Sequence, residues 1–397
     1  AVKTLDVIYE MPYLAHAPME PLNCLADVKA DSCNLYIGTQ AQTIEQNTAA
    51  HILGLKPEQV KVHTQLLGGA FGRRAIFDGH ITAEAVQTSK AVGAPVKVIW
   101  SREDDIQGGY YRPVAYHKIV GSINASGKPH SWHHRVVCQS FIIGSPMEAG
   151  MIKDGLDGIA VEGVAELPYD IPNFQVEWHR GMDVVPTLWM RSVGHSSNAF
   201  AKECFIDELA FAAGKDPFEY RSSLMGKHTR LRNVLEVAAN KAGWGKPLPA
   251  GHAHGIAVHE SFQSFIAQVA EVSVNAAGKI KVHKVICVID CGPIINPDTI
   301  KAQMEGSVVF GMTSALYGEI SFKDGKVEQR NFHDYKLLRI DEAPEVEVHI
   351  IESTESMGGV GEPGVPPVAP AIANAVFVLT QKRIRKMPFP VNVNTLV

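Results

Sequence analysis

The sequence of 397 residues predicts an α+β fold, in which mixed sheets and hairpins pack against helices. Segments with the alternating pattern of strands are interspersed with segments of helical spacing along the whole chain. Turns rich in asparagine and glycine separate neighbouring strand-like segments, which is typical of hairpins. The glycine turn GGAFGRR at 68–74 is not the G-x-G-x-x-G pattern of a dinucleotide-binding α/β domain.

The first hundred residues predict an alternation of strands and helices. Residues 3–10 alternate like a strand, and a second strand follows at the end of YLAHAPMEPLNCLADV. Residues 42–54 have polar ends, apolar helical spacing and a final glycine, so we expect a helix. A strand at 60–67 leads into the glycine turn, and residues 79–93 predict a helix that also ends at glycine. Residues 95–101 predict the next strand.

The middle of the chain predicts a hairpin and a long helix. Residues 117–137 form two alternating segments joined by a turn at Asn124–Gly127. Residues 197–214 have the spacing of an amphipathic helix. The composition then becomes rich in Lys, Gly and Pro, so we interpret 229–252 as a linker between one module at 1–228 and a second at 253–397.

The second module predicts a similar set of elements. Residues 267–292 form a hairpin with its turn at Ala276–Gly278, and residues 296–319 form a helix that begins with the capping sequence NPD. A third hairpin is expected at 320–332. A buried helix is expected from Ala371, because the prolines before it oppose regular helix. No repeat of fixed period is visible.

Composition excludes several classes of function. Hydrophobic residues make up 46% and charged residues 20% of the chain, as in packed globular proteins of two or three domains. A net charge of −5 without a Lys/Arg-rich run gives no indication of nucleic-acid binding. No run of about 18 apolar residues predicts a membrane span. The start AVKTLDVIYE lacks Met, which we interpret as processing or as one piece of a larger protein.

The cysteines and histidines do not form a recognisable metal motif. The six cysteines contain no C-x-x-C pair, and most are expected to be buried thiols. The stretch HSWHH (His130, Ser131, His133, His134) looks like a metal cluster. Neighbouring residues on a strand point to opposite faces, however, so these side chains would not converge on one ion.

A single carboxylate stands out in MGGVGEPGVPPVAPAIANAV, which spans 357–376. Glycines and prolines surround Glu362, and a helix follows. The pattern therefore places Glu362 on a tight loop near a helix N-terminus, where negative charge is favoured. A solvated loop glutamate is the ordinary alternative.

Four further stretches have residue types suited to anion or heterocycle binding. They place an amide at a strand end, a glycine turn, an arginine before a long helix and an amide on a helix. The residues are Gln40 in YIGTQAQT, Gly68–Gly72 in LLGGAFGRR, Arg191 in LWMRSVGHSSNAF and Gln303 in IKAQMEGS. Each has an ordinary alternative, namely a surface amide, a simple turn or a salt-bridge partner.

Taken together and in this order, these motifs resemble the molybdenum-binding subunit of the xanthine oxidase family. The similarity is with the branch of isoquinoline 1-oxidoreductase and membrane-associated aldehyde dehydrogenase large subunits. It rests on GTQ at Gln40, GGAFG, MRSVGHSSNAFAKECFIDELA, NPDTIKAQMEG and GVGEPGVPPVAPAIANAV. The resemblance implies molybdopterin-binding domains and the cofactor molybdopterin cytosine dinucleotide, with molybdenum carrying oxo, sulfido and hydroxo ligands.

The resemblance also implies roles for single residues. Glu362 would be the base, Gln40 would approach an oxo ligand and Arg191 would lie beside the active-site anions. The implied cofactor-binding residues are Gly69, Ala70, Phe71, Gly72, Arg73, Gln303 and Gly361. No protein ligand to the metal is implied, because pterin sulfurs hold molybdenum. The implied reaction is oxidation of an aldehyde or an N-heteroaromatic carbon, with water as oxygen source and hydride transfer to Mo=S.

Departures from the family indicate what else is needed. The turn continues as Arg73, Arg74 and Ala75, without the nearby glutamate of purine-oxidising members, which argues against a purine substrate. The M-G-Q-G turn and the serine-rich cofactor loop have no counterpart, so the chain resembles only a C-terminal half. We therefore expect a second chain that supplies the N-terminal half, and a small subunit with 2Fe-2S clusters. A periplasmic location is expected by resemblance, with the cytoplasm as the alternative.

Two other functions remain open from the sequence. The chain would act as a non-catalytic molybdopterin-binding or assembly subunit if its Glu362 loop were a relic. A cofactor-free hydrolase would use His195 and Ser196, although VGHSSNAF lacks the G-x-S-x-G context of a nucleophile elbow.

Overall fold

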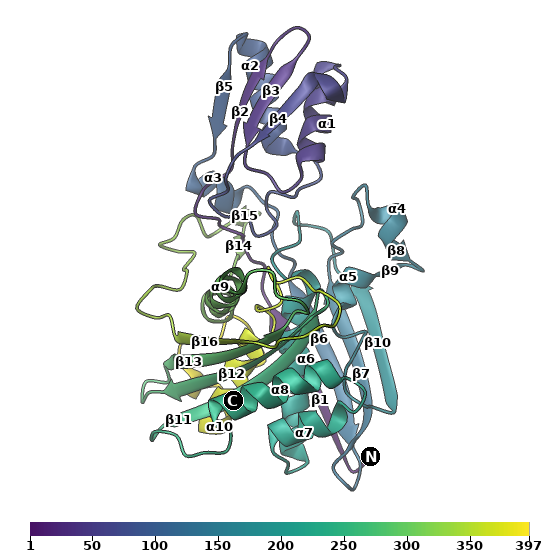
Figure 1. The fold of residues 1–397 in the computed structure, drawn as a ribbon, viewed down its shortest axis with the longest axis vertical. Helices are drawn as coiled ribbons and strands as arrows, with labels where there is room; N and C mark the ends of the chain where they lie inside the picture. The colour runs from purple at the N-terminus through teal and green to yellow at the C-terminus, as the bar shows by residue number, and fades with distance from the viewer. Residues whose placement is uncertain (397) are drawn as a thin grey trace.

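The computed structural model describes residues 1–396 and has a small upper lobe above a larger body (Figure 1). The predicted α+β class with mixed sheets is confirmed. Within the described residues, the body contains two four-stranded sheets and the lobe contains a third.

The first sheet of the body has the order β1-β6-β7-β10. Its strands are β1 (Lys3–Met11), β6 (Ala115–Ile123), β7 (Pro129–Cys138) and β10 (Asn173–Arg180). β1 and β7 both pair antiparallel with β6, which confirms the predicted hairpin, and β10 pairs parallel with β7.

The second sheet repeats this topology. Its order is β11-β12-β13-β16, with β11 (His252–Ser261), β12 (Ser264–Val274), β13 (Ile280–Asp290) and β16 (Glu345–Ile350). The first three strands again pair antiparallel, and the fourth pairs parallel with the third. The chain therefore contains two sheets of one topology, although its sequence shows no repeat.

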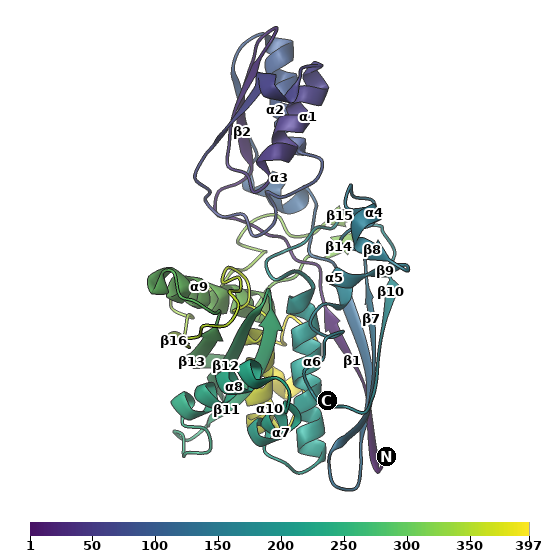
Figure 2. The ribbon, with the colours of Figure 1, turned by 45° about the vertical axis from the view of Figure 1, so that its right-hand side comes forward.

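Each sheet is followed by a buried helix, and the two helices pack together. α6 (Val193–Ala212) follows β10, and α10 (Val368–Thr380) follows β16. Figure 2 shows α6 between the two sheets, where it contacts β6 and β11. One hydrophobic cluster joins both sheets and both helices, and it includes Trp132, Phe205 and Ile372. The packing places the N-termini of α6 and α10 in one region.

The upper lobe has its own core. It consists of one sheet of order β4-β3-β2-β5 with two helices, and its core residues include Leu35 and Val86. Its elements are β2 (Asn23–Val28), β3 (Cys33–Ile37), α1 (Gln42–Leu53), β4 (Val60–Thr64), α2 (His80–Val92) and β5 (Val96–Ile99).

Six more α-helices and several short elements complete the described part of the chain. They are η1 (Pro57–Gln59), α3 (Arg102–Gln107), α4 (Glu148–Met151), β8 (Ile152–Lys153), β9 (Leu156–Asp157), α5 (Gly158–Val161), α7 (Pro217–Leu224), α8 (Thr229–Ala242), α9 (Pro297–Leu316), β14 (Phe322–Lys323), β15 (Lys326–Val327) and η2 (Val393–Thr395). None of the helices between residues 1 and 396 has the length and apolarity to cross a bilayer.

The segment 229–252, interpreted from composition as a linker, is mostly a packed helix. α8 occupies 229–242 and lies on β12 and β13. Its polar residues obscure an apolar stripe with helical spacing, formed by the buried Leu231, Val234, Leu235, Ala238 and Ala239. The division into modules at 1–228 and 253–397 stays a prediction.

Two helices begin earlier in the chain than the sequence predicted. α10 begins at Val368 rather than Ala371, because Pro370 lies in its first turn, where a missing N–H costs no helical hydrogen bond. α6 begins at Val193 rather than at 197, so Gly194 and His195 belong to its first turn. The strand expected at 60–67 ends at Thr64, and the third hairpin is reduced to β14 and β15.

Truncation of Leu235 tests whether α8 is part of the core. The Leu235 side chain is fully buried, so Leu235→Ala should lower the free energy of unfolding by about 2–5 kcal/mol. Lys241→Ala, at an exposed position of the same helix, should change it by less than about 0.5 kcal/mol. Chemical denaturation of the two variants measures both values. Equal, small effects would show that 229–242 is a dispensable connection.

Candidate active site

The loops that precede α6 and α10 are joined by hydrogen bonds. The backbone N–H of Ser192 donates to Oε1 of Glu362 at 2.9 Å, and the Ser192 hydroxyl donates to the Glu362 carbonyl at 2.6 Å. Nε of Arg191 donates to the carbonyl of Gly361 at 2.7 Å. Glu362 is half-buried at this junction, so the predicted tight loop near a helix N-terminus is observed at α6.

Arg191 extends the junction to α9. Its Nη2 donates to Oε1 of Gln303 at 2.8 Å and to the hydroxyl of Ser307 at 2.9 Å. The guanidinium also lies over the ring of Phe310, 5.6 Å from its centroid. Burial lowers the pKa of Arg191, and the nearby carboxylate of Glu362 opposes this effect. Arg191 therefore holds α9 and the Glu362 loop together.

The glycine turn contributes backbone groups from the upper lobe. The N–H of Gly72 donates to Oε1 of Gln40 at 3.1 Å, and the carbonyl of Phe71 accepts the N–H of Arg191 at 3.0 Å. Gly72 has a φ of 102°, and a Cβ there would lie 2.5 Å from the carbonyl oxygen of Trp189. Only glycine suits this position. The turn is thus packed directly onto the strand-like segment before Arg191.

Arg74 anchors the same turn. Its guanidinium donates to the carbonyls of Gly69 and Gly38 and forms an ion pair of 3.0 Å with Glu20. The anchor ties the turn to the end of β3, near Gln40. This role was not predicted from the sequence.

Arg73 does not join the junction through its side chain, and its role as a cofactor-binding residue stays a prediction. Its guanidinium is buried between the rings of Trp100 and Tyr110, with Nη2 3.1 Å from Nε2 of His80. The reason is the chain direction after Gly72, which turns the residue back toward α2. Only its backbone takes part in the turn, through a hydrogen bond to Ala70.

The structure thus brings together most of the predicted site residues. They are Gln40, Phe71, Gly72, Arg191, Gln303, Gly361 and Glu362, while Gly69 and Ala70 support the turn. Their segments lie far apart in the sequence. Their roles toward a cofactor stay predictions.

Glu162 is a further acidic residue at this place, and the sequence analysis missed it. Its Oε1 accepts the N–H groups of Gly194 at 2.7 Å and His195 at 3.2 Å. Glu162 and Glu362 therefore bind the N-terminus of the same helix. Burial, with a contribution from the Glu362 charge, raises the pKa of Glu162 to about 8. No sequence motif around Glu162 signals this environment.

The hydrolase alternative finds no support in the geometry. The Ser196 hydroxyl donates to the carbonyl of Arg191, whereas His195 is directed to His259 and Glu162. In HSWHH, His134 is buried against His117, and His133 contacts Glu177. Nowhere in residues 1–396 do three His, Cys, Asp or Glu side chains form a metal-binding group.

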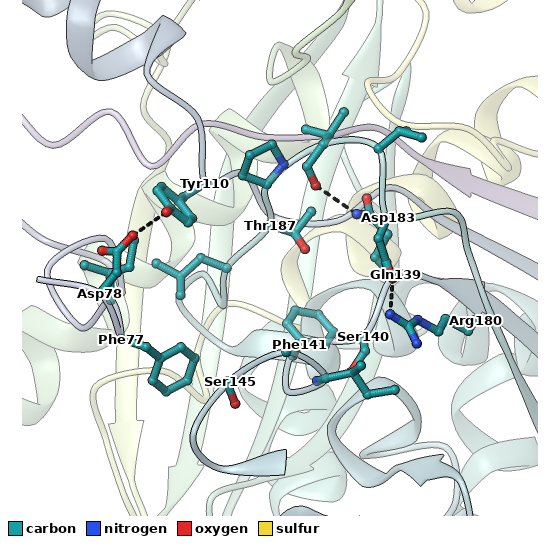
Figure 3. Close-up of a pocket in the computed structure, with 17 residues that line it drawn as sticks. Phe77, Asp78, Tyr110, Gln139, Ser140, Phe141, Ser145, Arg180, Asp183 and Thr187 are labelled. Atoms are coloured by element: carbon teal, nitrogen blue, oxygen red, sulfur yellow. Dashed lines mark hydrogen bonds and ion pairs between the residues drawn. The ribbon is translucent and has the colours of Figure 1, made fainter. Parts of the chain in front are cut away.

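One cavity borders the junction, and a second lies along the segments just after the glycine turn and just before Arg191. An apolar cavity of about 350 Å³ is bounded by Phe71, Arg191 and Phe310. A second cavity of about 570 Å³, shown in Figure 3, has Phe77 and Tyr110 on one side and Phe141 on the other. Figure 3 also shows the hydrogen bond of Tyr110 to Asp78 at its edge. The apolar cavity directly contacts the predicted site residues.

Comparison with protein families places two matches on the chain. Residues 1–225 and residues 214–344 each match a molybdopterin cofactor-binding domain. These matches cover the upper lobe, the first sheet of the body and the strands β11, β12 and β13 of the second sheet.

Curated relatives extend over most of the chain. The chain is 30% identical to the beta subunit of isoquinoline 1-oxidoreductase from Brevundimonas diminuta, over 96% of the chain and 49% of the relative. It is 30% identical to the membrane-bound aldehyde dehydrogenase [pyrroloquinoline-quinone] of Gluconacetobacter polyoxogenes, over 97% of the chain and 53% of the relative. A nicotinate dehydrogenase subunit of Pseudomonas putida is 29% identical over 98% of the chain and 34% of the relative. The chain spans about half the length, or less, of these relatives.

Solved structures share the fold. Quinoline 2-oxidoreductase of Pseudomonas putida 86 aligns with a TM-score of 0.85 and 12% identity, over 99% of this chain and 76% of that one. Aldehyde oxidoreductase of Desulfovibrio gigas aligns with a TM-score of 0.78 and 16% identity, over 99% and 61%. At these identities the similarity shows the fold alone.

The raised pKa of Glu162 predicts a pH-dependent stability. Between pH 4.5 and about 8, the folded chain keeps a proton on Glu162 that the unfolded chain has released. The contribution of Glu162 to the free energy of unfolding therefore falls as pH rises, by at most about 1.4 kcal/mol per pH unit. Glu162→Gln lacks this titration, so its stability relative to the wild type should increase up to about pH 8.

Denaturation midpoints of both proteins across this pH range measure the difference. Glu305→Gln, at an exposed position on α9, is the matched control for loss of a carboxylate. A constant difference between Glu162→Gln and the wild type would contradict the assignment.

Proposed function

Because the chain belongs to the molybdenum-binding subunits of the xanthine oxidase family, we propose that it is part of a molybdenum hydroxylase. The reaction would oxidise an aldehyde or an N-heteroaromatic carbon, with water as the source of oxygen. The family match over residues 1–225 and the names of the relatives support this class. Since the chain spans about half of its relatives, the activity is proposed for the assembled protein.

The residues at the junction fit a molybdopterin. Gln40 keeps its amide N–H groups available beside Gly72, and Gly361 faces open space, since a Cβ there would meet nothing within 4 Å. Arg191 adds a positive charge that suits an anionic cofactor. Gln40, Gly72, Arg191 and Gln303 would hold the cofactor, which we propose to be the cytosine dinucleotide form.

The hydrogen bond between Ser192 and Glu362 is the observation that carries the proposal. It fixes one carboxylate oxygen and leaves the other free, which is the arrangement that a general base requires. When bound, the molybdenum centre would supply the two-electron oxidant, with hydride accepted by its sulfido group. Glu362 would take the proton from the nucleophile derived from water, and Arg191 would keep the Glu362 loop in place through Gly361.

The surroundings favour a small apolar substrate. The cavity of about 350 Å³ beside Phe71 and Arg191 is lined mainly by apolar side chains. Arg74, which follows the glycine turn, is engaged by Glu20 and by backbone carbonyls, so it does not provide a polar contact for a purine ring. An aldehyde or an aromatic ring suits this cavity better than a purine.

Assembly with partners completes the proposal. We propose, from the family resemblance, a second chain that supplies the remainder of the molybdenum-binding part; this chain matches about half of two relatives. A small subunit with 2Fe-2S clusters would accept the electrons. Two of the relatives are named as single subunits of their enzymes, which agrees with a multi-subunit protein. The periplasm is the proposed location.

A non-catalytic molybdopterin-binding subunit is the second hypothesis. It predicts stoichiometric molybdenum in the purified complex without oxidation of any aldehyde or N-heterocycle. The hydrogen bond that orients the Glu362 carboxylate at the junction favours the hypothesis of an enzyme.

Replacement of Glu362 by glutamine tests its role as base. Glu362→Gln keeps an oxygen that accepts the Ser192 N–H but cannot take a proton, so molybdenum content should stay near that of the wild type. Turnover should fall by at least about 100-fold, as expected for loss of a general base. Metal analysis and steady-state rates of the assembled protein measure both quantities.

Glu355→Gln, an exposed glutamate in the same segment, is the control and should leave metal content and rate unchanged. Full activity of Glu362→Gln would refute the assignment of the base.

A further inference from the structure

A row of four titratable side chains leads from the Glu362 junction into the body. Oε2 of Glu162 lies 3.6 Å from Nε2 of His195. Nδ1 of His195 is 2.9 Å from Nε2 of His259, and Nδ1 of His259 is 2.9 Å from Nζ of Lys202. His195, His259 and Lys202 are buried, and His259 is completely inaccessible to solvent. The proposed reaction at Glu362 does not use any of them.

The row has two self-consistent arrangements of protons. With Lys202 as ammonium, Lys202 donates to His259, and both imidazoles carry their proton on Nε2, directed toward Glu162. With Lys202 as neutral amine, both imidazoles carry the proton on Nδ1, and a protonated Glu162 donates to His195. Transfer of one proton along the row converts the second arrangement into the first.

The two imidazole rings are tightly packed where they meet. Gly163, with a φ of 74°, lies against this contact, and a Cβ at this position would be 2.6 Å from Nδ1 of His195 and 2.8 Å from Nε2 of His259. The ring of Phe262 also contacts His195 edge-on, with 5.3 Å between the ring centroids. The contact between the two imidazoles is therefore enclosed and shielded from water. The longest gap, 3.6 Å at Glu162, is of a size that catalytic contacts close when a site is loaded.

Carboxylates act on both ends of the row, as transfer of a proton to and from the row requires. At the inner end, Glu162 and Glu362 bind the same helix N-terminus, and the charge of Glu362 acts on Glu162. At the other end, Lys202 is itself buried, and the exposed carboxylates of Glu166 and Glu260 act electrostatically on it.

Burial keeps both imidazoles of the row neutral. It lowers the pKa of both imidazoles, of which His195 falls to about 3, and it lowers the pKa of Lys202. The charged groups that act on members of the row are Glu362 and Asp157 at Glu162, and Glu203, Arg221, Glu166 and Glu260 at Lys202. Neutral imidazoles conduct protons by exchange of tautomers.

We propose that Glu162, His195, His259 and Lys202 form a relay that carries the proton taken up at Glu362 to the surface. The inference rests on the proposed function, in which the two electrons leave to the 2Fe-2S partner. In each passage the O–H bond of Glu162 breaks as an N–H bond forms at Nε2 of His195, and Glu162 then takes up the proton that Glu362 gives up. The proton on Nδ1 of His195 moves to His259, and the one on Nδ1 of His259 moves to Lys202. Lys202 then releases one proton toward Glu166 or Glu260, and each imidazole ring turns over between passages, which returns its proton to the Nδ1 position.

Proton arrival at Glu162 after a light-triggered pH jump tests the relay without catalysis. The assembled, substrate-free protein is kept above pH 8, where Glu162 is ionised, and is mixed with a photolabile proton donor; the infrared band of protonated Glu162, identified by its loss in Glu162→Gln, is followed in time. His259→Gln keeps polar contacts but cannot exchange protons, so protonation should be slower by at least about tenfold. His134→Gln, in a similarly buried histidine pair away from the row, should match the wild type.

A second pair of variants removes no imidazole. Gly163→Ala should separate His195 from His259 and slow the protonation of Glu162 as His259→Gln does. Gly155→Ala introduces the same backbone strain, at a φ of 76° in open space, and should have no effect. Wild-type protonation rates in both Gly163→Ala and His259→Gln would overturn the relay.

Turnover separates the relay from the proposed function. In an active assembly, His259→Gln should delay the release of protons to a pH indicator relative to reduction of the iron–sulfur clusters. An assembly that oxidises no aldehyde or N-heterocycle would refute the proposed function, while the pH-jump experiment would still decide the relay.

Discussion

The N-terminus of α6 is the constraint on which the site depends. Its free N–H groups at Ser192, Gly194 and His195 hold two carboxylates, and the strained φ of 73° at Ser192 sets the direction of the first of these groups. A helix N-terminus stabilises negative charge, which explains why Glu362 is held there although it comes from the other half of the chain. The two sheets of one topology make this possible, because each delivers a buried helix, and the packing of α6 against α10 brings their preceding loops together.

The two carboxylates at the N-terminus of α6, of Glu162 and Glu362, have different hydrogen-bond donors. Burial raises the pKa of Glu162 to about 8, so Glu162 holds a proton at neutral pH, whereas Glu362 is held by the N–H of Ser192. The buried histidines and Lys202 behind Glu162 extend this arrangement away from the junction.

Local patterns predicted the hairpins and most helices, because turn glycines and helical spacing are properties of short segments. Glu362, Arg191 and Gln303 were recognised from motifs, and the fold places them in direct contact. Contacts over long sequence separations were not predictable. Glu162 has no motif, and its environment is created by α6 more than thirty residues away. The side-chain direction of Arg73 was not predictable either, because it depends on the packing of Trp100 and Tyr110. The apolar stripe of α8 was obscured by its polar composition.

A crystal structure of the assembled protein with its cofactor and a substrate analogue tests the arrangement most directly. The pterin should lie against Gln40, Gly72 and Arg191, with the free oxygen of Glu362 within about 2.6–3.2 Å of the analogue or of a water beside it. The hydrogen bond from Ser192 should remain. A cofactor bound elsewhere, with the Glu362 carboxylate turned to bulk solvent, would contradict the account.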